Sequence, residues 1–522
     1  MVVKRKNIHM DRIKCSASTQ MTIDADVNVP DSKPDVTKIL LEKGWIKIEE
    51  VKALENQVLV RGNLCFAFLY QCEYGDRNVS CMEGKIPFEE MVHVEGASGQ
   101  DTVRVGKKLE NLSIGMINSR KISVRAIAVI EPEIEELYDE EVLYDVEEVP
   151  MLQKKTKQLL TTEAAVERRD MLRIREEVKL PSNLPNIFEV IWDMVRICTM
   201  EFRIGDGKIY VQGEVQVFFL YEAEGEEGKL AYYETRLPIN MQLDCSDCME
   251  DMIPIIRYDI LDRRLEIKPD EDGEDRIAEL DMNVELDMKL YREEKTDILE
   301  DAYGVTEEVT GVFKTGHYRK LLCDERNKCI ATGKIKLNPL KSQMLQVCAV
   351  SGELAIDDTT VTEEGMQVDG AIELQILYTD LKEPNQFFAA SGSVPFTCRM
   401  DVKNMNDQTS HFLNATISQI TFSMPSNEEV EVNIQVNLHL SAFQNMAEEF
   451  LNGIQISELN SEKMKGLPSM IGYIAKEGDT LWQLGKKYYV PISQIAEANH
   501  LTTQELHRGD KLIIVKSMEK RV

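Results

Sequence analysis

Apolar and polar residues alternate along three segments of this chain, and the three segments resemble one another. They read VLVRGNLCFAFLY at Val58–Tyr70, IYVQGEVQVFFLY at Ile209–Tyr221 and MQVDGAIELQILY at Met366–Tyr378. A period of two with one apolar face is typical of a half-buried β-strand. The apolar faces are Val58, Val60, Leu64, Phe66, Phe68 and Tyr70; Ile209, Val211, Val215, Val217, Phe219 and Tyr221; and Met366, Val368, Ile372, Leu374, Ile376 and Tyr378.

Each segment has a central glycine, and prolines around it recur at the same sequence separations from the glycine. The glycines are Gly62, Gly213 and Gly370, and a proline follows each after 25 residues, at Pro87, Pro238 and Pro395. Because these strands are long, we expect each glycine to mark a bulge or a bend. The first two copies share a further proline, Pro34 and Pro185, where the third has Ser342. This spacing indicates a triplicated unit.

Further alternating segments close each copy, at 121–130, 278–286 and 430–440. Together the patterns predict a mainly β protein with three sandwich or barrel-like domains, each with its own core. We expect a helical stretch at Leu152–Arg169 between copies. The predicted domains are residues 1–150, 151–312 and 313–452, followed by a linker at 453–470 and a small domain at 471–516.

The pattern of the last segment changes to a helical period and predicts a βααβ unit. Tyr473–Lys476 and the end of Leu506–Ile514 have strand character, whereas Leu481, Leu484 and Tyr488 have helical spacing. Ile492, Ile495 and Ala496 repeat that spacing, and Asn499 would end the second helix. Asp479 or Thr480 would cap the first helix, since their side-chain oxygens accept bonds from helix N–H groups.

This last segment resembles a LysM domain, and the three copies resemble SPOCS (spore-coat-associated) domains. Three SPOCS copies followed by one LysM domain is the layout of SipL-type spore-coat morphogenetic proteins, and the resemblance covers nearly the whole chain. It implies a LysM groove, with no catalytic residue, that binds a protein or an N-acetylglucosamine-containing glycan. The implied groove residues are Gly478, Asp479, Thr480, Leu481 and Trp482, with Asn499, His500 and Leu501 opposite.

The role of Trp482 has two interpretations. It lies about 100° around the helix from Leu481, so it is either an exposed anchor for a partner or a residue that packs on the second helix. The pair Lys486–Lys487 is either a solvated face or a contact for an acidic partner. Both questions stay open at the level of sequence.

The charge of the chain limits its partners. The formal net charge is −30 in 522 residues, which disfavours nucleic acid and anionic lipid as partners. The last domain is different, since it carries six cations and five carboxylates. The N-terminal MVVKRKNIHMDRIK has no apolar stretch after it, so we expect no signal peptide and no membrane span.

The cysteines and histidines indicate no metal or cofactor site. The 11 cysteines are expected as free thiols. Cys245 and Cys248 form a single CxxC, which we interpret as two thiols in a loop rather than a metal or redox site. No phosphate-binding loop and no hydrolase or zinc-protease motif is recognisable, and the acidic runs at 131–148 and 270–275 are expected to be solvated.

We therefore expect a non-enzymatic protein without cofactors. The resemblance implies a place in the mother-cell cytoplasm at the forespore surface. There the LysM domain would dock on a coat protein such as the morphogenetic ATPase SpoIVA, and the copies would contact other coat components or themselves. The alternative is an acidic β-rich scaffold anchored to cortex or wall peptidoglycan through glycan binding.

Overall fold

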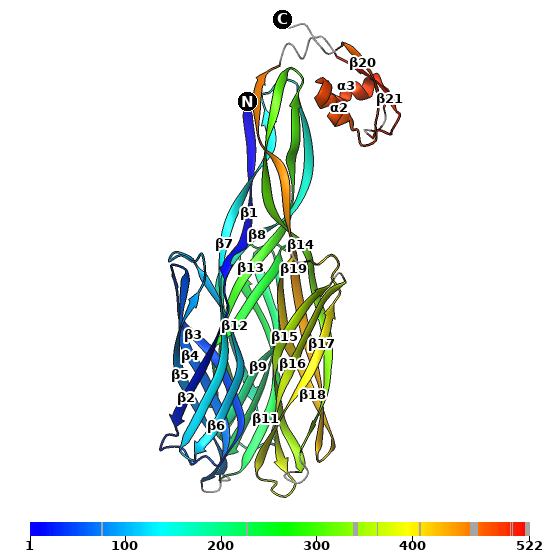
Figure 1. The fold of residues 1–522 in the computed structure, drawn as a ribbon. Helices are drawn as coiled ribbons and strands as arrows, with labels where there is room; N and C mark the ends of the chain where they lie inside the picture. The colour runs from blue at the N-terminus through cyan, green and yellow to red at the C-terminus, as the bar shows by residue number, and fades with distance from the viewer. Residues whose placement is uncertain are drawn as a thin grey trace.

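Three β-sandwiches stand side by side below a long twisted stalk, and a small α/β domain lies at its tip (Figure 1). The computed structural model describes residues 1–74, 77–225, 228–337, 343–362, 364–406, 409–459, 468–501, 503 and 505–516. Ser342, predicted to mark the divergence of the third copy, lies outside these residues. No helix among them is long and apolar enough to cross a membrane.

Each copy contributes two antiparallel sheets that face each other. In copy 1, β3-β4-β5 faces a sheet in which β7 pairs with β1, β2 and β6. The strands of this copy are β1 (Val2–Ser16), β2 (Thr19–Asn28), β3 (Lys38–Leu54), β4 (Gln57–Tyr74), β5 (Arg77–His93), β6 (Val103–Asn118) and β7 (Lys121–Glu147).

Copies 2 and 3 repeat this arrangement. The sheet β9-β10-β11 faces β8-β13-β12, and β15-β16-β17 faces β14-β19-β18. The strands of copy 2 are β8 (Leu152–Lys179), β9 (Ile187–Gly205), β10 (Lys208–Ala223), β11 (Leu230–Asp244), β12 (Ile253–Pro269) and β13 (Asp275–Gly304). Those of copy 3 are β14 (Glu307–Lys336), β15 (Met344–Thr362), β16 (Gly365–Asp380), β17 (Phe387–Met400), β18 (Thr409–Ser426) and β19 (Glu429–Glu458).

The three glycine-containing segments form the central strands β4, β10 and β16, and all their predicted apolar faces line the cores. Each copy has its own core of buried side chains drawn from both sheets. The predicted fold class and the separate cores are thus confirmed, as are the closing segments, which lie in β7, β13 and β19.

The glycines allow close backbone approach rather than a bend in their own strands. A Cβ on Gly62, Gly213 or Gly370 would lie 2.1–2.3 Å from a carbonyl oxygen of the neighbouring strand. The predicted bulge exists, but on that neighbouring strand, where a residue is skipped in the pairing, at Glu49, Cys198 and Asp357. The central strands continue through the glycine without a bulge, which corrects the prediction of a bulge or bend at the glycine itself.

The repeated prolines lie on edge strands. Pro87, Pro238 and Pro395 each pair with the residue after their copy's glycine, on strands with one hydrogen-bonded neighbour. Proline has no N–H to donate, so an edge position costs no ladder bond.

The segment predicted as a helix, Leu152–Arg169, belongs to strand β8. It pairs with β13 over its whole length, from Leu152 opposite Gly304 to Arg169 opposite Asp287. Its Gln, Lys, Glu and Ala residues favour a helix, but that preference is below about 1 kcal/mol per residue and tertiary pairing overrides it. The prediction was therefore wrong.

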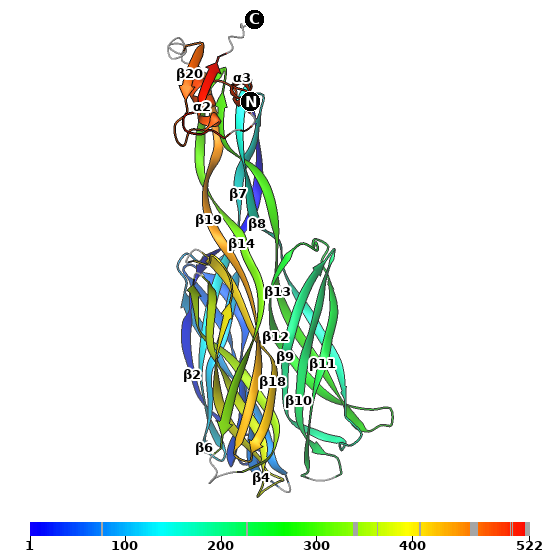
Figure 2. The same cartoon turned by 90° about the vertical axis from the view of Figure 1, so that its right-hand side faces the viewer.

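The stalk is made of three two-stranded ribbons, one from each copy. The outer halves of β1 and β7, β8 and β13, and β14 and β19 continue beyond the sandwiches and wind around one another (Figure 2). Two apolar clusters inside the stalk draw residues from all three ribbons. Since β19 runs to Glu458, residues 453–458 are strand rather than the start of the predicted linker.

Most of the acidic run at 131–148 lies in the outer half of β7, where its partner is the basic N-terminal strand β1. Cross-strand ion pairs join Lys4 to Glu147 and Arg5 to Glu141, while Val142 and Val146 point inward. Alternation on a half-buried strand therefore accommodates both the charges and the apolar contacts.

Two further contacts hold the copies together. An apolar cluster joins equivalent positions of the three central sheets, Leu69, Leu220 and Leu377 among them. At the base of the stalk, Asp11 of copy 1 binds Lys289 of copy 2 (3.0 Å) and Arg319 of copy 3. The copies therefore surround a common axis.

Four of the cysteines predicted as free thiols are disulfide-bonded. Cys245 and Cys248 are joined within the loop between β11 and β12, and Cys329 on β14 is joined to Cys398 on β17. The Cα atoms of the two pairs lie 5.4 and 6.0 Å apart, within the usual range for a disulfide. Sequence spacing does not show that β14 faces β17.

Candidate functional site

The domain at the tip has the predicted βααβ order. Its elements are β20 (Met470–Ile474), α2 (Leu481–Tyr488), α3 (Ile492–Ala498) and β21 (Lys511–Val515). The first strand begins and ends earlier than the predicted Tyr473–Lys476. Leu481, Leu484 and Ile495 form the core with residues of both strands, as predicted.

The turn before α2 is fixed by side-chain caps. Thr480 is the N-cap, since its hydroxyl accepts from Gln483 N–H while the Gln483 side chain accepts from Thr480 N–H. Asp479 instead accepts from Lys476 N–H and from the Tyr473 hydroxyl, both at 2.8 Å. The backbone N–H of Lys476 and the Tyr473 hydroxyl lower the pKa of Asp479. Gly478 has a φ of +87°, which favours glycine.

The loop after α3 is held by Asn499. Its amide donates to the carbonyls of Ile495 and Ile513, and its oxygen accepts from Ile513 N–H at 2.6 Å. The side chain therefore joins α3 to β21 and has little capacity left for a ligand. His500 follows with a positive φ of 54° and an exposed side chain.

Seven of the eight predicted groove residues, all except Trp482, thus fall into two groups. Gly478, Thr480 and His500 are exposed and available to a ligand. Leu481 and Leu501 pack in the core, and Asp479 and Asn499 are engaged in turns. The groove itself remains a prediction, but any contact with a partner must come mainly from the exposed group.

Trp482 contacts the stalk, which neither sequence interpretation anticipated. Its indole N–H donates to Asp301 Oδ2 of β13 at 2.8 Å, and its ring meets that of Tyr303 edge-on at 4.9 Å between centroids. Lys486 binds both Asp301 oxygens at 2.7 and 2.8 Å. One of the two predicted lysines therefore has an acidic partner, and that partner belongs to the same chain.

The same interface has two further bonds. The Tyr303 hydroxyl donates to Val490 O at 2.8 Å, and Tyr489 donates to Glu308 Oε2 at 2.6 Å. Gly485 makes room, since a Cβ there would lie 2.3 Å from the Tyr303 oxygen. A glycine in the middle of α2 is the one sequence signal that could have indicated a close neighbour.

We predict that Asp301→Asn releases the tip domain from the stalk. The substitution removes the charge that Lys486 binds and weakens the acceptor of Trp482, a loss of roughly 1.5–3 kcal/mol for bonds to a charged group. A red shift of Trp482 fluorescence and faster proteolysis between β19 and β20 would report release. Asp297→Asn, an exposed site on the same strand, should change neither, and equal behaviour of the two variants would contradict the prediction.

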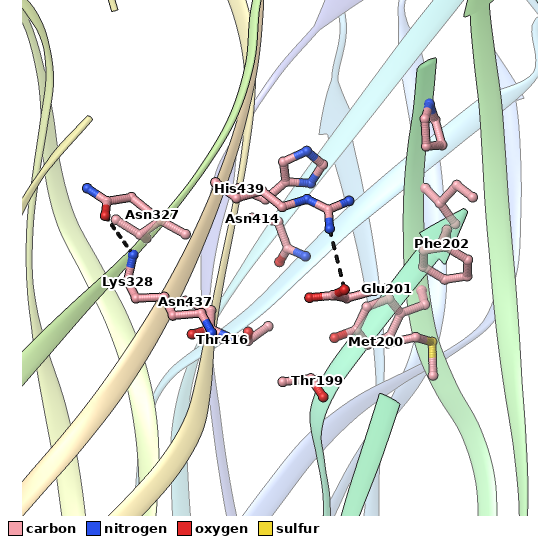
Figure 3. A pocket seen from close by; sticks show the side chains of 15 residues that line it. Thr199, Met200, Glu201, Phe202, Asn327, Lys328, Asn414, Thr416, Asn437 and His439 are labelled. Carbon is pink, nitrogen blue, oxygen red and sulfur yellow. Dashed lines mark hydrogen bonds and ion pairs between the residues drawn. The ribbon is translucent and has the colours of Figure 1, made fainter. Parts of the chain in front are cut away.

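A small hollow lies between copies 2 and 3, away from the LysM domain (Figure 3). Its volume is about 130 Å³, and Arg326 of copy 3 crosses it to reach Glu201 of copy 2 at 3.6 Å. Amide and hydroxyl side chains line the copy 3 side, including Asn414, Thr416 and Asn437. The copy 2 side is mainly apolar, with Met200, Phe202 and Ile256, so we interpret the hollow as a mixed polar and apolar contact between two sandwiches.

The comparisons with known families agree with this architecture. Residues 35–117, 186–268 and 343–425 match the family described as SipL, SPOCS domain, and residues 473–515 match the LysM domain. No curated protein and no solved structure matches the chain. Each SPOCS match covers the central sheet and the strand after it, whereas the stalk ribbons lie largely outside the matched segments.

Proposed function

This chain belongs to the SipL-type proteins, which combine repeated SPOCS domains with a LysM domain, and we propose that it is a non-enzymatic assembly protein of the spore coat. SPOCS and LysM domains are binding and structural domains rather than catalytic ones. The proposed role is to dock through the LysM domain on a basement-layer coat protein and to recruit or scaffold other coat components.

The position of the LysM domain carries this proposal. It stands at the tip of a stalk that all three copies build, and its α2 face is bound to that stalk. Gly478, Thr480 and His500 stay exposed. A binding module held at one end of a long body suits a protein that attaches at one place and presents its sandwiches at a distance.

The partner that we propose is a coat morphogenetic ATPase of the SpoIVA type, at the forespore surface in the mother cell. With six cations and five carboxylates, residues 471–516 are nearly neutral, so the charge of the body need not repel a partner at the tip. The sandwiches offer further surfaces for coat proteins or for self-association.

The alternative occupant of the groove is an N-acetylglucosamine-containing glycan, because LysM domains generally bind such glycans. The exposed turn at Gly478 offers backbone groups to either ligand. If the groove binds glycan, the protein would be a scaffold anchored to cortex or wall peptidoglycan.

Direct binding of the full chain distinguishes the two. The double variant Thr480→Asn/His500→Asn changes the exposed groove, while asparagine keeps the N-cap and tolerates the left-handed backbone. We expect affinity for the purified ATPase to fall about tenfold or more, whereas Ser493→Asn, exposed on α3, has no effect. Saturable binding of chitotetraose instead, lost in the double variant, would replace the docking proposal with the glycan anchor.

A further inference from the structure

A large hollow lies between copies 1 and 2 and reaches copy 3. Its volume is about 1010 Å³, within the range of small-molecule sites. Two of the three tryptophans of the chain, Trp45 and Trp192, line it. Tryptophan is enriched at binding sites, so this cleft is a candidate that the proposed docking function does not use.

Equivalent positions of the three copies meet in this cleft. Trp45, Arg196 and Glu353 each stand seventeen residues before the glycine of their copy, and all three line the cleft. They lie on β3, β9 and β15, whose sheets surround the common axis. The triplicated fold thus directs an indole, a guanidinium and a carboxyl group toward one space.

Among the residues that the structure describes, Arg196 forms no ion pair in the cleft. Its Nη2 donates to the neutral Gln216 Oε1 at 2.7 Å, and its buried Nη1 has no hydrogen-bond partner in the described part of the chain. Burial lowers the pKa of Arg196. A buried guanidinium without a carboxylate is costly, and a bound anion would offset that cost.

Glu353 also lacks a cationic partner in the described part of the chain. Among the described residues it makes no ion pair within 4.0 Å, and burial raises its pKa. Its side chain nevertheless remains accessible from the cleft. Asp193, which also lines the cleft, is paired, since it binds Lys43 at 3.1 Å and Arg263 at 2.8 Å. Among the described residues, Lys47, Glu83, Lys85 and Asp262 line the cleft without an ion pair. Arg196 and Glu353 therefore carry opposite charges into one cleft without pairing with each other.

The two tryptophans add an apolar surface and a donor. Trp45 is 42% exposed. Trp192 is 3% exposed, and its indole N–H has no acceptor among the described residues. It lies four residues from Arg196 on β9, about 13 Å along the strand. A ligand with acceptors at several points is needed to satisfy both donors.

We propose that this cleft binds a short zwitterionic peptide. Its carboxylate pairs with Arg196, its ammonium group pairs with Glu353, and an apolar side chain lies against Trp45. A peptide carbonyl accepts from the indole N–H of Trp192.

Titration of the full chain with alanyl-alanyl-phenylalanine tests this proposal. Trp482→Phe serves as the background, so that only Trp45 and Trp192 fluoresce, and calorimetry measures the affinity independently. We expect saturable binding that weakens about tenfold or more when the peptide is N-acetylated or C-amidated. No saturation up to about 10 mM, or equal affinity for the free and blocked peptides, would overturn the proposal without any cleft variant.

Two variants assign the charges. Arg196→Gln should remove the preference for the free carboxylate and keep that for the free amine, and Glu353→Gln should do the reverse. Arg264→Gln is the matched control, because Arg264 lines the same cleft but pairs with Glu266 at 2.9 Å. If Arg196→Gln weakens the binding of the free, N-acetylated and C-amidated peptides equally, that result would also contradict the proposed contacts.

Discussion

Replacing Asp11 by alanine is expected to destabilise the junction of stalk and sandwiches by about 3–5 kcal/mol, the usual cost of breaking a buried ion pair from one side. Asp11 is 6% exposed and binds Lys289, Arg319 and the Tyr291 hydroxyl, which donates at 2.8 Å. Its loss leaves the half-buried Arg319 without a carboxylate partner among the described residues, whereas the buried Lys289 keeps Glu135 at 2.6 Å. Hydrogen exchange of stalk peptides and urea unfolding would measure the effect.

The same carboxylate predicts a pH dependence. Burial by itself would raise the pKa of Asp11, but Arg319 and Lys289 together hold it below its usual value. A lowered folded-state pKa stabilises the fold fully above the unfolded value of about 3.9 and loses that effect as pH falls through the folded value. The stability gap between the wild-type chain and Asp11→Asn should therefore be constant near neutrality and shrink below about pH 4.

An exposed ion pair of the same sheet provides the control. Asp24 pairs with Arg125 at 3.0 Å, and both side chains are more than half exposed. Asp24→Asn should cost less than about 1 kcal/mol. Similar losses of stability for the Asp11 and Asp24 variants would mean that the contacts of Asp11 with Lys289 and Arg319 do not hold the copies together.

Replacing Gly213 by valine is expected to open copy 2, with a loss of about 3 kcal/mol or more. A Cβ at this position would lie 2.1 Å from Thr199 O and 3.2 Å from Met200 Cα. These are backbone atoms of β9, so no side-chain rotation relieves the clash, and β9 must separate from β10. A lower thermal midpoint, with exchange protection lost in β9, would show it.

Gly115→Val is the matched substitution, because a Cβ at Gly115 has no atom within 4 Å. Valine favours strands, so this variant should be as stable as the wild-type chain or slightly more stable. If Gly213→Val keeps the wild-type midpoint, close strand approach is not the reason for the repeated glycine.

The contact between the LysM domain and the stalk changes how a Trp482 variant is interpreted. Trp482→Ala breaks the bond to Asp301 as well as any bond to a partner. Loss of binding in that variant therefore reports domain placement unless Asp301→Asn is measured beside it. The exposed residues Thr480 and His500 are the cleaner probes of docking.

The sequence by itself determined the repeat, the period of the strands and the cores of the individual copies. These follow from alternation and spacing, which act between near neighbours and leave a local signature such as the apolar face of Val58–Tyr70. The βααβ order of the last domain and an N-cap at Asp479 or Thr480 were predictable for the same reason, and the structure selects Thr480.

Only the tertiary structure decided how the copies join. The stalk, the contacts of Asp11 and the contact of Trp482 with Asp301 bring together residues far apart in the chain. In each case the sequence pattern of a segment is compatible with several pairing partners, so the pattern alone does not select one. Helix formers in Leu152–Arg169 became strand because β13 offered a complete ladder of hydrogen bonds. Trp45, Arg196 and Glu353 share one position in the repeat, but only the threefold packing makes them line one cleft.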